Sequence, residues 1–292
     1  MDGEKHRIIV LSHANPDVDS IISGNLMQKL LRSKGCTADY IIPDKNISEE
    51  TETICLKYGI NPRDYKGEVP EDANLFLVDH YKTDFEGKVI GIIDHHPTNE
   101  TIQCGKYTNT DSSSTAMLIY NLEPSIFNID DIKRVAIANL IDTICFSSTK
   151  TVQSDKEWTI RVCKENGFDY EEMYSDGLCL TDITDLEVAS INGEKKYSYN
   201  GNKVKSSYIQ FKDIEQDKLN QLINILKQRL INEELDMWVF VAHNMDEFRT
   251  DAYLITEDNC EVINYENVAS RGTTIMPFVE KRFKERTERS EM

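Results

Sequence analysis

The chain has 292 residues, which at roughly 150 residues per domain is enough for two domains. Asp and Glu number 51 against 33 Lys and Arg, so the formal charge at pH 7 is −18. A field of that sign repels the phosphates of nucleic acids and of anionic lipids, so we expect neither nucleic acid nor a membrane surface as a partner.

The N-terminal half alternates short apolar runs with helical patterns, which predicts a doubly wound, mainly parallel α/β sheet. The predicted strands are Arg7–Ser12, Ala38–Ile42, Asn74–Asp79 and Lys88–Asp94. The predicted helices are Ile21–Leu31, Ser113–Leu122, Asp131–Cys145 and Ser154–Asn166. Ligands of such folds gather where the strands end, at their carboxyl edge.

Composition changes at Leu186–Lys205, which has few large apolar residues, and we interpret this stretch as an interdomain linker that runs into a new strand. The predicted domains are residues 1–188 and 201–292, joined by a linker at 189–200. The second domain is expected to be a smaller α/β unit. Its predicted elements are a helix at Gln216–Leu230, strands at Met237–His243 and Ala252–Thr256, and a frayed or disordered tail at Glu280–Met292.

Targeting signals and cysteine usage give a further expectation. No apolar run approaches the ~18 residues of a membrane span, and the N-terminus lacks the apolar stretch of a signal peptide. Seven cysteines without a CxxC spacing argue against a disulfide framework. We therefore expect a cytoplasmic protein with reduced thiols.

Aspartates and histidines follow three of the predicted strands. The segments are His13–Ser20 (HANPDVDS), Asp79-His80 and Asp94-His95-His96. Carboxylate oxygen and imidazole nitrogen at one sheet edge are typical of a cluster of divalent metal ions. For Asp19 taken alone, capping of a helix explains the residue as well as metal binding does.

These segments resemble the motifs of the DHH phosphoesterase superfamily. HANPDVDS, LVDHY and IIDHHP are similar to its first three motifs, and ANLIDTICF, which contains Asp142, is similar to the fourth. Ser270–Thr274 with Pro277 resembles the S-R-K-K-Q motif of the DHHA2 C-terminal domain. The resemblance implies a phosphoanhydride hydrolase of the DHH–DHHA2 branch, which includes family II manganese-dependent inorganic pyrophosphatases and exopolyphosphatases.

The resemblance also implies two divalent ions, Mn²⁺ or Co²⁺, with Mg²⁺ able to enter with the substrate. The implied ligands are His13, Asp17 and Asp79 for one ion, and Asp19, Asp79, His95 and Asp142 for the other, with Asp79 as the bridge. Asp94 and His80 would orient ligating imidazoles. His96 would contact the substrate and act as general acid.

In the C-terminal domain, the resemblance implies that Arg271 binds phosphate, with Lys203 or Lys205 as a second contact. Gly272 stands where the family has a lysine, and Tyr81 stands where an asparagine is usual. The substrate is expected to be pyrophosphate, with short-chain polyphosphate as the alternative. Two alternative functions remain open: a DHH phosphodiesterase, and a catalytically weakened relative that only binds ligands. Related pyrophosphatases often pair, so a homodimer is the oligomer that the resemblance implies.

Overall fold

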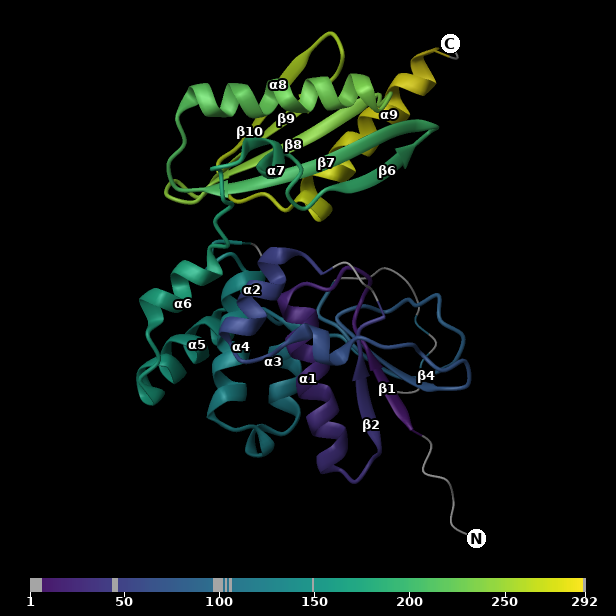
Figure 1. The fold of residues 1–292 in the computed structure, drawn as a ribbon, viewed down its shortest axis with the longest axis vertical. Helices are drawn as coiled ribbons and strands as arrows, with labels where there is room; N and C mark the ends of the chain where they lie inside the picture. Colours follow the sequence, from purple (N-terminus) through teal and green to yellow (C-terminus); the bar gives the residue numbers. More distant parts are fainter. Residues whose placement is uncertain are drawn as a thin grey trace. The chain divides into compact units, whose positions relative to one another are not determined.

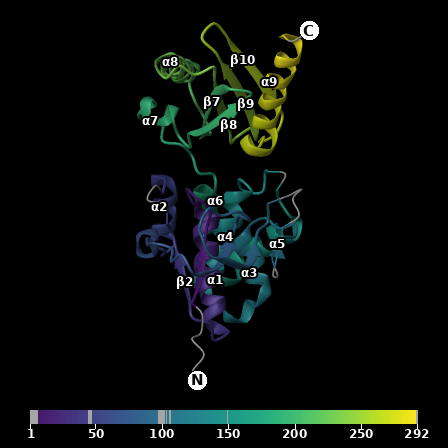
Figure 2. The same cartoon turned by 90° about the vertical axis from the view of Figure 1, so that its right-hand side faces the viewer.

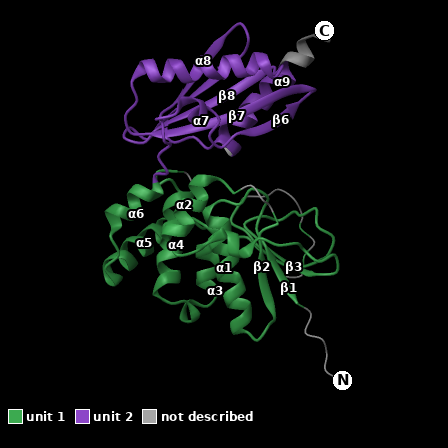
Figure 3. Ribbon diagram, in the orientation of Figure 1, with its two compact units in different colours: residues 1–177 green, residues 178–292 purple. Residues whose placement is uncertain are grey.

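The computed structural model describes residues 7–43, 47–96, 102, 104, 107–148 and 150–290. The chain divides into two compact units, residues 1–177 and 178–292 (Figure 3). Within the described ranges, every helix is too short or too polar to cross a lipid bilayer.

The division falls before residue 188, where the sequence predicts the first domain to end. The predicted linker at 189–200 is wrong: α7 (Leu186–Ser190) ends within it, and β6 (Lys195–Tyr199) pairs antiparallel with β7 (Asn202–Phe211). The side chains of β6 are half-buried or exposed because it is an edge strand. Its polar sequence therefore resembles a linker.

Unit 1 is built on a parallel sheet of five strands in the order β2-β1-β3-β4-β5. The strands are β1 (Ile8–Leu11), β2 (Ala38–Ile41), β3 (Asn74–Val78), β4 (Lys88–Ile93) and β5 (Tyr107–Thr108). The first four confirm the predicted strands, and the sequence analysis did not find β5, which has only two residues. The inner strands are apolar because both sheet faces are buried.

Helices of unit 1 form layers beside this sheet (Figure 1). They are α1 (Val18–Ser33), α2 (Glu49–Lys57), α3 (Thr115–Leu122), α4 (Ile129–Asp142), α5 (Gln153–Asn166) and α6 (Tyr170–Gly177), with short 3₁₀ turns at Pro62–Tyr65 and Pro124–Ile126. Helices α1 and α3 contact the sheet. Helix α4 packs on α1 and α3, and helices α5 and α6 pack on α4. The sequence analysis missed α2, which buries only Thr51 and Cys55 and so has a weak apolar stripe.

Helix α4 ends at Asp142, three residues before the predicted end at Cys145. Ile144, Cys145 and Phe146 have φ values of 49°, 52° and 65°, which is a left-handed turn. Non-glycine residues adopt this backbone at a cost, and such strain often lies at functional sites. The turn stops the helix so that Asp142 is its last residue.

Unit 2 has a mixed sheet in the order β10-β9-β8-β7-β6, in which only β7 and β8 are parallel. Its further elements are α8 (Gln216–Asn232), β8 (Met237–Asn244), β9 (Arg249–Ile255), β10 (Cys260–Tyr265), a π-helical turn (Arg271–Ile275) and α9 (Met276–Ser290). Figure 2 shows α8 and α9 on opposite faces of this sheet, and each face has its own apolar core. The tail predicted to fray is helical as far as Ser290, because Val279 and Phe283 are buried.

His243 lies in the core of unit 2, on the face of the sheet that α9 covers. Only 5% of its surface is exposed, and its Nδ1 lies 2.8 Å from the Thr250 hydroxyl. Burial, assisted by the nearby charge of Arg271, lowers the pKa of His243 to about 4. The folded protein therefore holds this imidazole neutral at pH values where the unfolded chain protonates it.

We predict that this residue makes unit 2 sensitive to acid. As the pH falls below 6.5, the imidazole of His243 becomes protonated in the unfolded chain, whereas in the folded chain it stays neutral down to about pH 4. The free energy of unfolding therefore decreases as the pH falls from 6.5 to about 4. The shift of 6.5 − 4 = 2.5 units corresponds to at most about 3 kcal/mol. In urea denaturation, the free energy of unfolding of His243→Asn should fall by that much less than the free energy of the unmodified protein as the pH is lowered from 6.5 to about 4. Equal slopes for the two proteins would contradict this prediction.

Candidate metal centre

The chain reverses its direction across the sheet between β1 and β3, because β2 lies beyond β1 whereas β4 and β5 lie beyond β3. At such a switch point the loops after the two strands diverge and leave a crevice, which is where open α/β sheets bind ligands. His13 and Asp17 follow β1, and Asp79 follows β3 directly. The topology therefore brings these residues together.

Asp79 lies at the centre of the crevice with only 2% of its surface exposed. Its Oδ2 accepts a hydrogen bond from the Ser20 hydroxyl at 2.5 Å, and its Oδ1 accepts one from the Thr115 hydroxyl at 2.9 Å. Its φ of 65° is left-handed, and its N–H donates to the carbonyl of Ile93 on the neighbouring strand. Burial and the charge of Asp17 raise the pKa of Asp79 to about 6.

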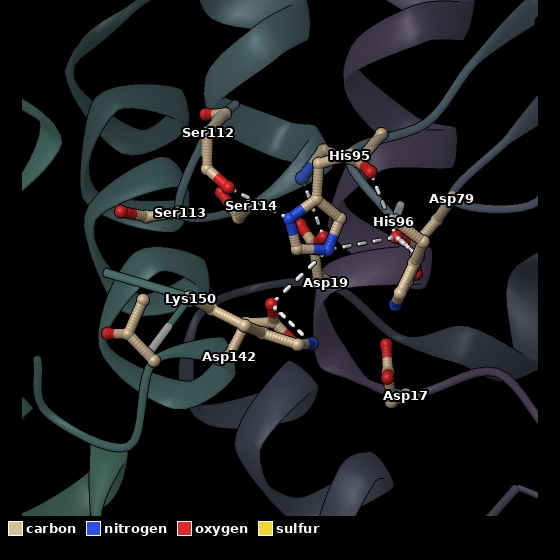
Figure 4. Close-up of polar contacts among 12 residues, drawn as sticks. Asp17, Asp19, Asp79, His95, His96, Ser112, Ser113, Ser114, Asp142 and Lys150 are labelled. Atoms are coloured by element: carbon tan, nitrogen blue, oxygen red, sulfur yellow. Dashed lines mark hydrogen bonds and ion pairs between the residues drawn. The ribbon is translucent and has the colours of Figure 1, made fainter. Parts of the chain in front are cut away.

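The two oxygens of Asp79 face two separate groups of side chains. Its Oδ2 lies 3.6 Å from His13 Nε2, which is also 3.8 Å from Asp17 Oδ2. Its Oδ1 lies 3.7 Å from His95 Nε2 and 3.6 Å from His96 Nδ1 (Figure 4). Each group offers ligand atoms close enough to hold one metal ion, and Asp79 is common to both.

Hydrogen bonds fix the tautomers of two of these histidines. His13 Nδ1 lies 2.7 Å from the carbonyl of Ala14, and His95 Nδ1 lies 3.0 Å from the carbonyl of Ser112. A carbonyl only accepts, so both Nδ1 atoms donate, and a neutral ring then presents a lone pair at Nε2. His95 Nε2 is buried, has no hydrogen-bond partner among the described residues and lies 3.2 Å from Asp142 Oδ2. This donor set fits a divalent metal ion.

In the group formed by His13, Asp17 and Asp79, the imidazole of His13 favours its protonated form even without a metal. Burial opposes protonation of His13, but its attraction to Asp17 and Asp79 prevails and raises its pKa to about 9. Burial likewise opposes ionisation of Asp17, but His13 holds the pKa of that carboxyl well below its usual range. In the metal-free chain, the proton on His13 Nε2 therefore occupies a position between two carboxylates that would also attract a metal cation.

His96 is held by the aspartate that precedes the histidine pair. Its Nδ1 donates to Asp94 Oδ1 at 2.9 Å, and its backbone N–H donates to the same oxygen. Burial opposes protonation, but the hydrogen bond to Asp94 and the charge of Asp79 raise the pKa of His96. His80 donates from Nδ1 to the carbonyl of Val78, and burial lowers its pKa.

Asp19 caps a helix, although not the helix on which it lies. Its two oxygens accept from the backbone N–H groups of Thr115 and Ala116 at 2.8 and 3.0 Å, at the start of α3. The positive end of the helix dipole favours a carboxylate there. Burial and the charge of Asp79 nevertheless raise its pKa well above the usual value, so Asp19 lies close to the other acids. The cap of α1 itself is Asp17, which accepts from Ser20 N–H.

Asp142 is paired with a lysine that the sequence analysis did not single out. Lys150 Nζ lies 3.0 and 3.1 Å from the two carboxylate oxygens of Asp142 (Figure 4). Asp142 ends α4, where the helix dipole disfavours a negative charge, so a cation is needed beside it. Nothing in the sequence indicates this pair, because an irregular turn separates the two residues.

A buried carboxylate behind the site fixes the loop that orients His95. Asp155 Oδ2 accepts from the Ser112 hydroxyl at 2.9 Å and from the Ser113 N–H at 2.8 Å. The carbonyl of Ser112 is the acceptor for His95. Asp155 therefore acts on His95 through Ser112, and only the fold shows this connection.

We predict that Asp155→Ala lowers the free energy of unfolding of the metal-free protein by about 2–6 kcal/mol, because it leaves two buried donors without an acceptor at about 1–3 kcal/mol each. Glu157→Ala on the same helix is the matched control, since Glu157 is exposed and should change stability by less than about 0.5 kcal/mol. Chemical denaturation measures both. Equal stability of the two variants would contradict the role given to Asp155.

In unit 2, the structure does not favour Lys205 as a phosphate contact. Lys205 is buried, and its Nζ pairs with Glu194 at 2.7 Å and Glu233 at 2.5 Å. Its charge is therefore already neutralised. Lys203 lies two residues earlier on β7, so its exposed side chain is on the same face of the sheet as that of Lys205.

Arg271 lies on the other face of this sheet. Its guanidinium stacks 5.1 Å from the ring centre of Tyr208 and donates to the carbonyl of Gly193 at 2.5 Å. Tyr208 packs with the core beneath α9, whereas Lys205 lies over Trp238 in the core beneath α8. Arg271 and Lys205 therefore do not form one cationic pair.

The chain is similar to several known proteins. Residues 7–146 match the DHH family, N-terminal domain. The chain is 25% identical to the manganese-dependent inorganic pyrophosphatase of Methanocaldococcus jannaschii over 94% of this chain and 98% of that protein. It is 23% identical to the enzyme of the same name from Bacillus subtilis, over 92% and 93% of the two chains.

A solved structure shares the fold. The crystal structure of a putative family II inorganic pyrophosphatase from Methanococcus jannaschii superposes with a TM-score of 0.66 at 24% identity, over 95% of this chain and 99% of that one. Residues 7–146 of unit 1 match the family whose motifs the sequence of this unit resembles.

Proposed function

We propose that this DHH-domain protein is a manganese-dependent inorganic pyrophosphatase, which hydrolyses pyrophosphate to two phosphates. The observation that carries the proposal is Asp79, whose buried carboxylate directs one oxygen to His13 and the other to His95. The similarity to enzymes of that name over almost the whole chain supports it.

The proposed site holds two Mn²⁺ ions, and Co²⁺ has similar ligand preferences. We assign His13, Asp17 and Asp79 to one ion, and Asp19, Asp79, His95 and Asp142 to the other. The N–H groups that Asp19 binds leave further lone pairs on its oxygens, so they orient this carboxylate without blocking it. Lys150 would release Asp142 when the second ion takes its place.

When bound, such a pair of ions lowers the pKa of a water that they share and neutralises charge on the phosphate oxygens. His96 supplies the proton for the leaving phosphate. Its Nδ1 is committed to Asp94, so the proton available to the substrate is at Nε2, and Asp94 and Asp79 raise the pKa of the ring against the effect of burial, so that its charged form is favoured. Asp94 orients His96 and stabilises its charged form.

Arg271 is the proposed phosphate contact from unit 2; Lys203 shares the sheet face of Lys205, so it would not contact the same phosphate as Arg271. A Cβ at Gly272 would meet no atom within 4 Å, so the residue that stands where the family has a lysine occupies open space. Because Gly272 replaces a lysine, the site has one cation fewer to bind a compact anion such as pyrophosphate. Short-chain polyphosphate is therefore the second substrate to test.

We expect Asp142→Asn to lower the rate of phosphate release from pyrophosphate by at least about 100-fold while the circular dichroism spectrum is unchanged, because the variant loses one charged ligand. Asp130→Asn, at the exposed start of the same helix, is the matched control and should keep full activity. The assay uses Mn²⁺-loaded protein with pyrophosphate, tripolyphosphate and a dinucleotide.

Full activity of Asp142→Asn would refute the ligand assignment. Release of phosphate from tripolyphosphate but not from pyrophosphate would identify an exopolyphosphatase. Hydrolysis of the dinucleotide alone would identify a phosphodiesterase.

A further inference from the structure

Unit 1 has a pocket beside the metal centre that extends well beyond it. The pocket has a volume of about 790 Å³. At one end it is lined by His13, Asp79 and His96 of the metal centre. It is also lined by the loop between β3 and β4, which contributes Tyr81 and Phe85.

The pocket is too large for pyrophosphate alone. Pockets of about 300–1,000 Å³ usually hold organic molecules of drug size, whereas pyrophosphate has only nine non-hydrogen atoms. Metal ions and one phosphate would fill the end at the metal centre. The space beside the β3–β4 loop is therefore available to a further part of a ligand.

The lining of that space indicates which chemical group it fits. Tyr81 and Phe85 line it, and we call these two residues the aromatic annex. Phe85 is 42% exposed, so its ring is accessible to a ligand in the pocket. Aromatic faces stack with planar rings, and each such contact with a base contributes about 1–3 kcal/mol.

Charge argues against an extended polyphosphate in the annex. The charged residues of the β3–β4 loop that line the pocket are Lys82 and Asp84, which cancel. Lys82 Nζ already lies 5.4 Å from the ring centre of Tyr81. A chain of phosphates needs several cations, so an uncharged planar group suits this end of the pocket better.

We propose that the site binds phosphate esters whose organic part is a planar aromatic base, with the phosphate at the metal centre and the base on the aromatic annex. Nucleoside monophosphates have this chemistry, and they would compete with pyrophosphate. The inference rests on the proposed function only in assigning the phosphate to the metal centre.

The test compares AMP with ribose 5-phosphate, which lacks the base, on the Mn²⁺-loaded protein. Isothermal calorimetry gives the affinity of each, and inhibition of pyrophosphate hydrolysis is measured separately. We expect AMP to bind about tenfold more tightly than ribose 5-phosphate. Phe85→Ala should abolish this difference and leave the KM for pyrophosphate unchanged. Phe278→Ala is the matched control, because Phe278 is 39% exposed but lies in unit 2.

Equal affinities of AMP and ribose 5-phosphate for the unmodified protein would overturn the inference, and so would a difference that persists in Phe85→Ala. If the protein gives either of these two results and still hydrolyses pyrophosphate, the proposed function is supported and only the inference about the aromatic annex is refuted. A difference that depends on Phe85 in a protein that does not hydrolyse pyrophosphate would support the annex and refute the proposed function.

Discussion

The buried carboxylate of Asp79 is the constraint on which the rest of the site depends. A charge with 2% exposure is costly unless it is paired and hydrogen-bonded. Two hydroxyls donate to its oxygens, yet burial and the charge of nearby acids raise the pKa of Asp79 to about 6. The crevice therefore favours cations. His13, with a pKa raised to about 9, and Lys150 provide positive charge in the metal-free chain. A protein that concentrates acids in this way gives up stability for the ability to bind metal ions.

Local structure directs these acids toward each other. Asp17 caps α1, Asp19 caps α3, and Asp142 is held at the end of α4 by a left-handed turn. The capping bonds fix two carboxylates, whereas Asp142 lies at the unfavourable end of its helix dipole. Asp79 itself has a left-handed backbone. Strain and electrostatic cost thus concentrate where the proposed chemistry occurs, as is common at functional sites.

The sequence predicted the elements whose signal is local. Buried parallel strands read as continuous apolar runs, so β1 to β4 and the residues after them were predictable. The partners of these residues were not, because Lys150 and Asp155 reach the site only through the packing of the α4–α5 region. The polar edge strand β6 was mistaken for a linker, and the resemblance that suggested Lys203 or Lys205 as a phosphate contact gave no sign that two glutamates pair with Lys205. Such pairings depend on tertiary contacts that spacing along the chain does not encode.

The central claim is that Asp79 joins two metal ions. Titration of the metal-free protein with Mn²⁺, followed by calorimetry and by electron paramagnetic resonance, tests it most directly. The account predicts two ions per chain with magnetic coupling between them, and Asp79→Asn should bind at most one ion without coupling. A wild-type chain that binds a single ion, or an Asp79→Asn variant that retains a coupled pair, would contradict the account.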